Sequence, residues 1–283
     1  MIQIDMTKCT ECNRCFLACP DGNIAKGPVI RPEAPEHCIS CGSCYAVCPE
    51  NAITVVGFED AEIFSLSRET SPDAASLMAL LRGRRSCRSY KPVPVSKEQI
   101  EQILDAASVA PSSCNWRFVK AYVYTDEAVI SRIREKTTTY YRWLLRLFSL
   151  PGFPILARLI NLPSERLEYF KQDFRYRTTT TDRKDPFLYG AKTLVAFTVP
   201  KEAFAENGDA WIAAENAVIY AETIGVATCY NGYVSAVANM GSSVRTAMGI
   251  PKGESVVCVL KMGYPVLDFE RTAPRERMET VWT

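Results

Sequence analysis

Two runs of cysteines share one spacing that could assemble iron–sulfur chemistry. Each run has the pattern C-x2-C-x2-C-x3-C-P: the first is Cys9, Cys12, Cys15, Cys19 and Pro20, and the second is Cys38, Cys41, Cys44, Cys48 and Pro49. Three thiolates at this spacing can reach three corners of an iron–sulfur cube from a single tight loop. The spacing therefore predicts two 4Fe-4S clusters.

The fourth ligand of each cluster is expected to come from the other run, because in this arrangement the last cysteine serves the neighbouring cluster. The predicted sets are Cys9, Cys12, Cys15 and Cys48 for one cluster, and Cys38, Cys41, Cys44 and Cys19 for the other. Zinc sites and disulfides are the alternatives, but structural zinc usually uses paired C-x2-C units or histidine. The one histidine, His37, abuts Cys38 and is interpreted either as a hydrogen-bonding group near a cluster or as an ordinary surface residue.

The repeat resembles the bacterial two-cluster ferredoxins over residues 1–57. Its halves also match beyond the cysteines, since Pro20 leads to Ile24 and Ala25 as Pro49 leads to Ala52 and Ile53. The resemblance implies a pseudo-symmetric module in which short strands flank the cluster loops.

Length and charge indicate a second domain with different partners. A chain of 283 residues is too long for such a module alone. Residues 1–70 carry five Lys/Arg and ten Asp/Glu, a net charge of −5. Because the whole chain has a net charge of +1, the remaining residues carry +6. We expect a two-cluster domain over residues 1–60, a linker over 61–72 and a second domain over 73–283. The basic residues form no dense run, so no nucleic-acid partner is expected.

The compartment is expected to be reducing and cytoplasmic. The first residues lack the basic and apolar regions of a signal peptide, and twelve cysteines in a secreted chain would suggest disulfides instead. The most apolar segment, residues 143–162, is interrupted by Arg146, Arg158 and two prolines, so no membrane span is expected.

A second group of chemically informative residues follows a helix expected over residues 73–82. The sequence Arg84-Arg85-Ser86-Cys87-Arg88 offers forked guanidinium donors and a hydroxyl, which suit a phosphate. On this segment alone, a solvated basic turn is an equal alternative. Next, Ser96 and Gln99 form a capping-box pattern that predicts a helix up to Pro111, and a strand is expected over residues 119–124.

The order of these pieces, with Ala110-Pro111-Ser112-Ser113-Cys114-Asn115 before the strand, resembles the nitroreductase superfamily over residues 73–283. Further matches are a strand over residues 193–199, a core helix over 215–223 leading to Cys229-Tyr230-Asn231-Gly232, and a terminal Pro274-Arg275-Glu276-Arg277. The resemblance implies an α+β fold with a central, mostly antiparallel sheet flanked by helices. It also implies a homodimer with FMN at the interface.

The resemblance carries FMN contacts over to particular residues. It assigns the phosphate to Arg84, Arg85, Ser86 and Arg88 and to Arg275 and Arg277; the loop contacts are Ser112, Ser113 and Asn115, and the ring-facing loop is Cys229, Tyr230, Asn231 and Gly232. Family members commonly have Gln-Pro after the asparagine, whereas here Trp116 and Arg117 follow Asn115 directly. No side chain is assigned a catalytic role, because the chemistry is centred on the flavin.

The aromatic-rich segment over residues 136–183 corresponds to a helical excursion at about 137–185. In the family such excursions cover the open face of the flavin and influence substrate choice. Packing in a dimer interface or a satellite core is the alternative, and interfacial contact with a membrane is the third.

The resulting hypothesis is an iron–sulfur flavoprotein oxidoreductase that passes electrons between the clusters and FMN to reduce a nitroaromatic- or quinone-like molecule. The electron donor is expected to be an external ferredoxin or NAD(P)H. The alternative is an electron-transfer or redox-sensing module that docks a protein partner without turning over a small substrate.

Overall fold

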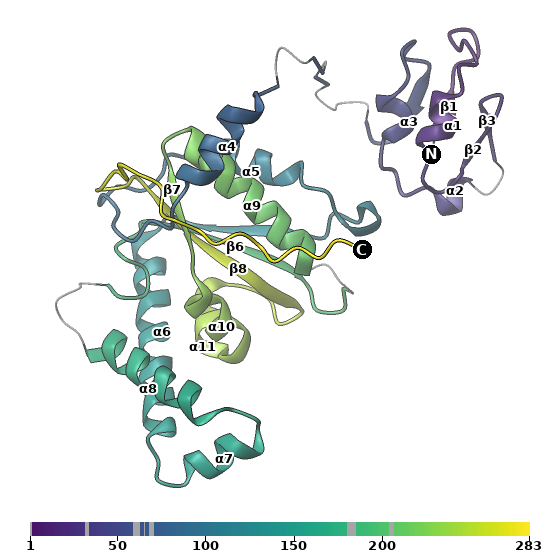
Figure 1. Ribbon diagram of the computed structural model, residues 1–283. Coiled ribbons are helices and arrows are strands. Elements are labelled where there is room, and N and C mark those ends of the chain that lie inside the picture. The colour runs from purple at the N-terminus through teal and green to yellow at the C-terminus, as the bar shows by residue number, and fades with distance from the viewer. Residues whose placement is uncertain are drawn as a thin grey trace. The chain divides into compact units, whose positions relative to one another are not determined.

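The computed structural model describes residues 2–31, 34–58, 63–64, 66–67, 71–179, 185–203 and 207–283 (Figure 1). It divides into two compact units. One unit contains Met1–Pro72 together with Ser112–Arg117, and the other contains Asp73–Pro111 and Phe118–Thr283.

The first unit is built from short elements that repeat. Its strands form two antiparallel pairs, in which Ile2 pairs with Val55 and Ile24 with Ile30. The pairs are β1 (Ile2–Ile4) with β4 (Ile53–Val55) and β2 (Ile24–Ala25) with β3 (Val29–Ile30), and the helices are α1 (Arg14–Ala18), α2 (Ala34–His37) and α3 (Ser43–Ala46).

The core of the first unit is small and includes two of the predicted ligands. Ile2, Ile24, Ile53 and Val55 are buried together with Cys15 and Cys44. A core of this size buries little apolar surface, so such domains usually need a metal group or disulfides for stability.

The second unit contains a four-stranded sheet in the order β5-β6-β8-β7, and every neighbouring pair is antiparallel. The strands are β5 (Lys120–Tyr124), β6 (Thr193–Pro200), β7 (Ala227–Tyr230) and β8 (Glu254–Gly263). The central strands β6 and β8 read as continuous apolar runs because both of their faces are buried.

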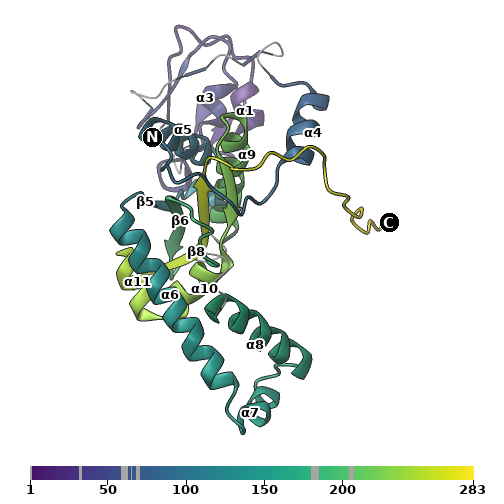
Figure 2. The same ribbon diagram turned by 90° about the vertical axis from the view of Figure 1, so that its left-hand side faces the viewer.

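Helices cover both faces of this sheet (Figures 1 and 2). On one face, α5 (Lys97–Ser108) and α9 (Asn207–Thr223) enclose a core containing Ile103 and Ala214. On the other face, α6 (Glu127–Phe148), α10 (Gly232–Met240) and α11 (Ser242–Met248) enclose a second core. The expected α+β class with an antiparallel sheet flanked by helices is confirmed.

Local sequence signals explain where several helices begin. The Oγ of Ser96 accepts a hydrogen bond from the N–H of Gln99 at the start of α5, and Asp126 caps α6 in the same way through two backbone N–H groups. Asp73 caps α4 (Ala74–Gly83), but none of the residues of α4 is buried. Its apolar side chains Leu77, Met78 and Leu81 are thus exposed to solvent in the isolated chain.

Three consecutive helices form an arm that leaves the sheet. The long helix α6 is followed by α7 (Phe153–Leu159) and α8 (Ser164–Thr179), and both views place α7 at the end of the arm away from the sheet (Figures 1 and 2). Within the described residues, no helix is long and apolar enough to cross a bilayer.

Candidate functional site

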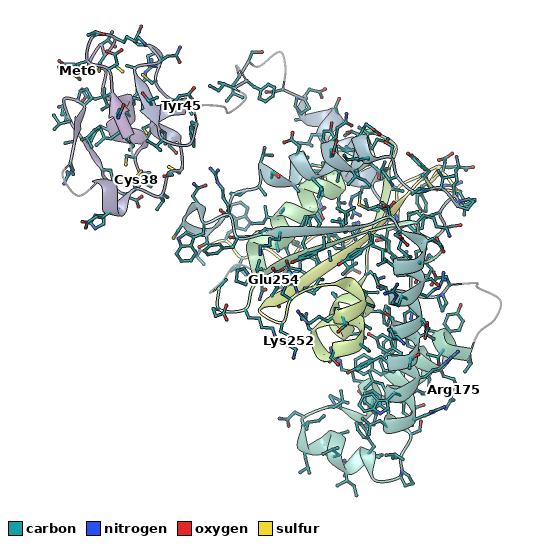
Figure 3. The ribbon with its side chains drawn as sticks, turned by 180° about the vertical axis from the view of Figure 1, so that it is seen from behind. Met6, Cys38, Tyr45, Arg175, Lys252 and Glu254 are labelled. Carbon is teal, nitrogen blue, oxygen red and sulfur yellow. The ribbon has the colours of Figure 1, made fainter. Side chains whose placement is uncertain are left out.

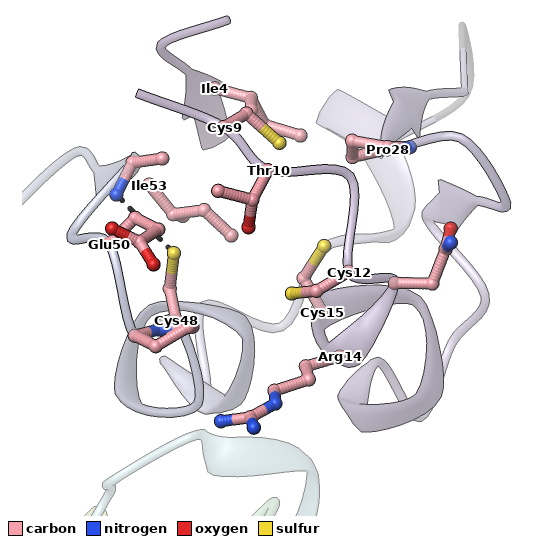
Figure 4. A pocket seen from close by; sticks show the side chains of 13 residues that line it. Ile4, Cys9, Thr10, Cys12, Arg14, Cys15, Pro28, Cys48, Glu50 and Ile53 are labelled. Atoms are coloured by element: carbon pink, nitrogen blue, oxygen red, sulfur yellow. Dashed lines mark hydrogen bonds between the residues drawn. The ribbon is translucent and has the colours of Figure 1, made fainter.

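Four cysteines from two separate runs surround one cavity in the first unit. Figure 4 shows the sulfur atoms of Cys9, Cys12, Cys15 and Cys48 directed into a common space that Ile4, Pro28 and Ile53 also line. Three of these cysteines belong to the first run and one belongs to the second. The structure therefore brings together the four residues that the spacing grouped as one ligand set.

The other four cysteines surround a second cavity of the same kind. Cys19, Cys38, Cys41 and Cys44 line it, together with the apolar side chains of Ile2, Ile39 and Val55. The exposure of the cysteines repeats between the runs, since Cys15 and Cys44 are buried whereas Cys12 and Cys41 are exposed. The two cavities are thus related by the internal repeat of the sequence.

A left-handed backbone conformation shapes each cysteine loop. Glu11 and Ser40, two residues after the first cysteine of their runs, have φ angles of 52° and 51°. Asn13 and Gly42, which precede α1 and α3, have φ angles of 61° and 74°. Such conformations turn successive N–H groups toward one side of a loop, which favours an anionic group there.

Backbone N–H groups donate to the cysteine sulfurs. The N–H of Asn23 lies 3.2 Å from the Sγ of Cys19, and the N–H of Ala52 lies 3.3 Å from the Sγ of Cys48 at the equivalent position. The N–H of Glu11 is 3.4 Å from the Sγ of Cys9. Hydrogen bonds to cluster sulfurs stabilise the more negative, reduced state.

Burial opposes deprotonation of the innermost thiols. Desolvation raises the pKa of Cys44 to about 11 and also raises the pKa of Cys15. Iron must therefore supply the charge that holds these residues as thiolates. Among the described residues, no three His, Cys, Asp or Glu side chains converge on one metal ion. In a 4Fe-4S cube each thiolate binds its own iron, so the ligands need not converge on one point.

His37 lies at the end of α2 and is exposed. It is adjacent to Cys38 in the chain but does not line either cysteine cavity.

A larger cavity of about 590 Å³ lies in the second unit. The segment after α4 contributes Ser86, Arg88 and Ser89, and a distant segment contributes Asp185 and Tyr189. The arginines of the segment from Arg84 to Arg88 have different surroundings. Arg88 lines the cavity, whereas the Nε of Arg84 lies 3.9 Å from a carboxylate oxygen of Glu215 on α9.

The carboxylate in this cavity wall is internally compensated. The Oδ1 of Asp185 accepts hydrogen bonds from the N–H groups of Phe187 and Leu188, at 3.3 and 2.8 Å. Its Oδ2 lies 3.5 Å from the Nη1 of Arg134. With that charge balanced, Ser86 and Arg88 leave the cavity favourable to an anion.

The ring-facing loop predicted from the resemblance forms the end of β7 and the start of α10. Asn231 is buried; its Oδ1 accepts from the N–H of Val234 at 3.3 Å and its Nδ2 donates to the carbonyl of Phe187 at 3.2 Å. Tyr230 donates its hydroxyl to Glu215 at 2.9 Å. The side chains of Tyr230 and Asn231 are thus occupied in holding the loop, and the N–H of Asn231 donates to the carbonyl of Val259 at 2.7 Å. The N–H groups at the start of α10 are the backbone donors left for a ligand.

The segment of Ser112, Ser113 and Asn115 groups with the first unit. The Nδ2 of Asn115 donates to the carbonyl oxygens of Ile39 and Ser40, both at 2.9 Å, and these residues lie in the second cysteine run. Cys114, Asn115 and Arg117 all have positive φ angles, so this segment follows an unusual backbone path. This unusual backbone lies where the sequence lacks the Gln-Pro that family members commonly have after the asparagine.

The C-terminal arginines are not gathered at the cavity. Arg275 and Arg277 are exposed in a segment without helix or strand, and neither lines the cavity that contains Ser86 and Arg88.

Sequence reasoning missed a buried lysine behind this cavity. Lys261 is only 3% exposed; its Nζ lies 4.0 Å from the ring centre of Tyr189 and 3.4 Å from the carbonyl oxygen of Phe187. Its strand position pairs with Cys229. The pKa of Lys261 is lowered to about 8, mainly by burial and to a smaller extent by Arg88 and Arg177, while Cys229 opposes this shift. A lysine within the apolar run of β8 was the signal that could have identified it.

Several residues of the aromatic segment form packing that positions the arm. The ring of Tyr141 lies 5.2 Å from that of Phe187 and 4.7 Å from that of Phe174, and all three are buried. Arg177 of α8 contacts two other segments, because its Nη1 donates to the carbonyl of Pro186 at 2.7 Å and its guanidinium lies over the ring of Tyr233 in α10. Core packing therefore accounts for these members of the segment.

A second polar cluster, at the start of β8, is structural. Glu254 follows Lys252 there (Figure 3), and its carboxylate accepts from Lys120 at 2.9 Å and Tyr122 at 3.1 Å. The hydroxyl of Thr198 donates to it at 2.6 Å. A buried carboxylate with three donors is well satisfied, so it is not a candidate for proton transfer.

Comparisons with known proteins agree with the two-part organisation. Residues 81–264 match the model of the nitroreductase family, and residues 1–57 match the model of a 4Fe-4S dicluster domain. The 4-nitrobenzoate reductase of Nocardioides sp. (strain LMS-CY) is 25% identical over 208 residues, which cover 68% of this chain and 82% of that protein.

Two further similarities are more limited. The putative NAD(P)H nitroreductase YdgI of Bacillus subtilis (strain 168) is 50% identical over 46 residues, covering 15% of this chain and only 22% of that protein's length. A nitroreductase with bound FMN from Bacteroides fragilis NCTC 9343 superposes with a TM-score of 0.55 at 18% identity, covering 73% of this chain and 98% of that one. The latter similarity concerns the fold.

Proposed function

The chain belongs to the nitroreductase family and carries an N-terminal 4Fe-4S dicluster domain, and from this premise we propose that it is an iron–sulfur flavoprotein oxidoreductase. In the proposed reaction, electrons pass between the clusters and FMN and reduce an electron-poor small molecule of the nitroaromatic or quinone type.

The observation that carries this proposal is the pair of four-cysteine cavities in the same chain as the nitroreductase domain. We assign Cys9, Cys12, Cys15 and Cys48 to one cluster and Cys19, Cys38, Cys41 and Cys44 to the other. The crossed arrangement makes each cluster bind both halves of the repeat, so loss of either cluster weakens the whole unit.

The cavity beside Ser86 and Arg88 fits the phosphate end of FMN. A guanidinium and a hydroxyl suit a dianionic phosphate, and about 590 Å³ falls within the usual range for cofactor sites. Bound FMN supplies the exchange between one-electron and two-electron transfer. Arg84 and Arg85 add positive charge to the same segment, and Arg275 and Arg277 are proposed to reach the phosphate from the tail.

The backbone of the loop from Cys229 to Gly232 is proposed to face the flavin ring. Gly232 begins α10, and the first N–H groups of a helix have no partner within the helix. Asn231 uses its side chain to fix this turn, which keeps those donors in place. Ser112, Ser113 and Asn115 are the further proposed contacts, supported only by the resemblance.

The proposed assembly is a homodimer with FMN at its interface. Leu77, Met78 and Leu81 of α4 are all more than 40% exposed. Such an apolar face is typical of a surface that a partner covers, which supports association of the second unit with another chain. The proposed electron donor is an external ferredoxin or NAD(P)H.

Acceptor turnover tests the proposal. Purified protein should contain one FMN and about eight irons per chain, as two 4Fe-4S cubes require. After anaerobic reduction it should transfer electrons repeatedly to nitrobenzene or a benzoquinone. If neither acceptor reoxidises the reduced protein although both cofactors are present, the result would instead favour a module that passes electrons only to a protein partner.

A further inference from the structure

The tip of the helical arm presents an apolar surface. We define the arm tip as residues 150–160. Phe153 and Ala157 of α7 are buried against Leu167 of α8, which leaves the opposite side of α7 outside the core. The outward side chains are aliphatic: Leu150 is 54% exposed, Ile155 69%, Leu156 48%, Leu159 76% and Ile160 61%. A cluster of exposed aliphatic side chains of this size indicates an interaction surface.

The charge around the arm tip is predominantly positive. Residues 142–164 contain Arg142, Arg146 and Arg158 and no aspartate, glutamate or lysine, and Glu165 at the start of α8 is the first acidic residue after them. All three arginines are exposed. This combination favours a covering surface with an apolar layer and negative charge.

Two kinds of protein partner fit this description less well. A contact in which two tips met each other across a twofold axis would place their arginines opposite one another without an acidic partner. A partner protein needs a complementary groove, whereas α7 is a short convex helix flanked by Pro151 and Pro163. An anionic bilayer offers both acyl chains and phosphates without requiring a matched shape.

We propose that the arm tip is a peripheral membrane-binding element. Ile155, Leu156, Leu159 and Ile160 enter the boundary of the acyl chains, while Arg146 and Arg158 contact lipid phosphates. The contact lies in the plane of the interface and involves no spanning segment. It is independent of the proposed redox function.

Vesicle sedimentation of the purified full-length protein tests this proposal. The protein should sediment with vesicles of phosphatidylglycerol and phosphatidylcholine, and more weakly with phosphatidylcholine alone. Ile155→Ser with Leu159→Ser should lower partitioning at least about 10-fold, because two aliphatic side chains no longer leave water. Arg158→Gln should lower it about 5-fold on the anionic vesicles only.

The matched control is Val109→Ser, which removes an aliphatic side chain of the same 76% exposure after α5. It should bind vesicles as the unsubstituted protein does, and circular dichroism should show that all variants are folded. Failure of the unsubstituted protein to sediment with anionic vesicles overturns the proposal. Unchanged vesicle binding by the double variant, with loss of a dimer in light scattering, overturns it in favour of an interface between copies.

Discussion

The cysteine cavities of the first unit and the Ser86–Arg88 cavity of the second unit are assembled in opposite ways. In the first unit, each cavity takes three ligands from one short loop, and the loop geometry follows from local backbone conformations such as those of Glu11 and Ser40. In the second unit, the cavity joins segments about a hundred residues apart, Ser86 to Ser89 with Asp185 to Gly190. A local site can be inferred from spacing alone, whereas a distributed site depends on the tertiary fold.

The largest expected effect tests the crossed ligand sets of the first unit. Cys48→Ser should remove one cluster and lower iron from about eight to about four per chain, because the cavity that contains Cys9 loses its fourth thiolate. Iron analysis with electron paramagnetic resonance measures this. The control Cys114→Ser alters an exposed cysteine outside both runs and should retain all the iron. If Cys48→Ser removes no iron, the ligand assignment is wrong.

The next effect concerns the buried lysine of the second unit. The pKa of Lys261 is lowered to about 8 from 10.5, so the folded state disfavours its charged form. Between these values the unfolded state binds more protons, and stability from this residue rises with pH. Lys261→Met should thus raise the unfolding free energy of FMN-free protein by up to about 3 kcal/mol below pH 8.

That gain should disappear as the pH approaches 10.5, as measured by urea denaturation at several pH values. Lys252→Met, at an exposed lysine, is the matched control and should show no such trend. A gain from Lys261→Met that stays constant across this pH range would mean that packing, not charge, determines its effect.

A smaller effect distinguishes cavity arginines from other surface arginines. Arg88→Gln should weaken FMN binding by about 10- to 100-fold, since a hydrogen bond to a charged group contributes about 1.5–3 kcal/mol. Flavin fluorescence during titration of FMN-free protein measures the dissociation constant. Arg82→Gln, on an exposed residue of α4 outside the cavity, should leave it unchanged. Equal effects of the two substitutions would show that general positive charge, and not this cavity, binds FMN.

The smallest effect concerns the segment whose assignment differs between resemblance and structure. Asn115→Ala removes two hydrogen bonds to the second cysteine run and should destabilise the first unit by about 1–2 kcal/mol. Its effect on FMN affinity should be small by comparison. Thermal loss of cluster absorbance and FMN titration measure the two effects. A large loss of FMN affinity with unchanged cluster stability would return Asn115 to the flavin site.

The sequence predicted the local features of the molecule well and missed those that depend on the tertiary fold. Cysteine spacing identified the two cluster-binding runs, and the Ser96 cap and apolar runs identified single helices and strands, because these signals are local. The antiparallel α+β arrangement was expected only from the resemblance to the nitroreductase superfamily. Lys261 and Asp185 were missed because their importance arises from burial and from contacts with Tyr189 and Arg134, which only the folded chain reveals. The contacts of Asn115 also depend on tertiary structure.

The central claim is that the clusters and FMN of this chain exchange electrons. An anaerobic titration with NADH, NADPH and reduced ferredoxin in turn, following flavin and cluster absorbance together, tests it most directly. We predict that at least one donor reduces both chromophores, and that the Cys48→Ser variant loses part of the cluster signal in the same titration. Reduction of one chromophore while the other stays oxidised, with every donor, would contradict the account.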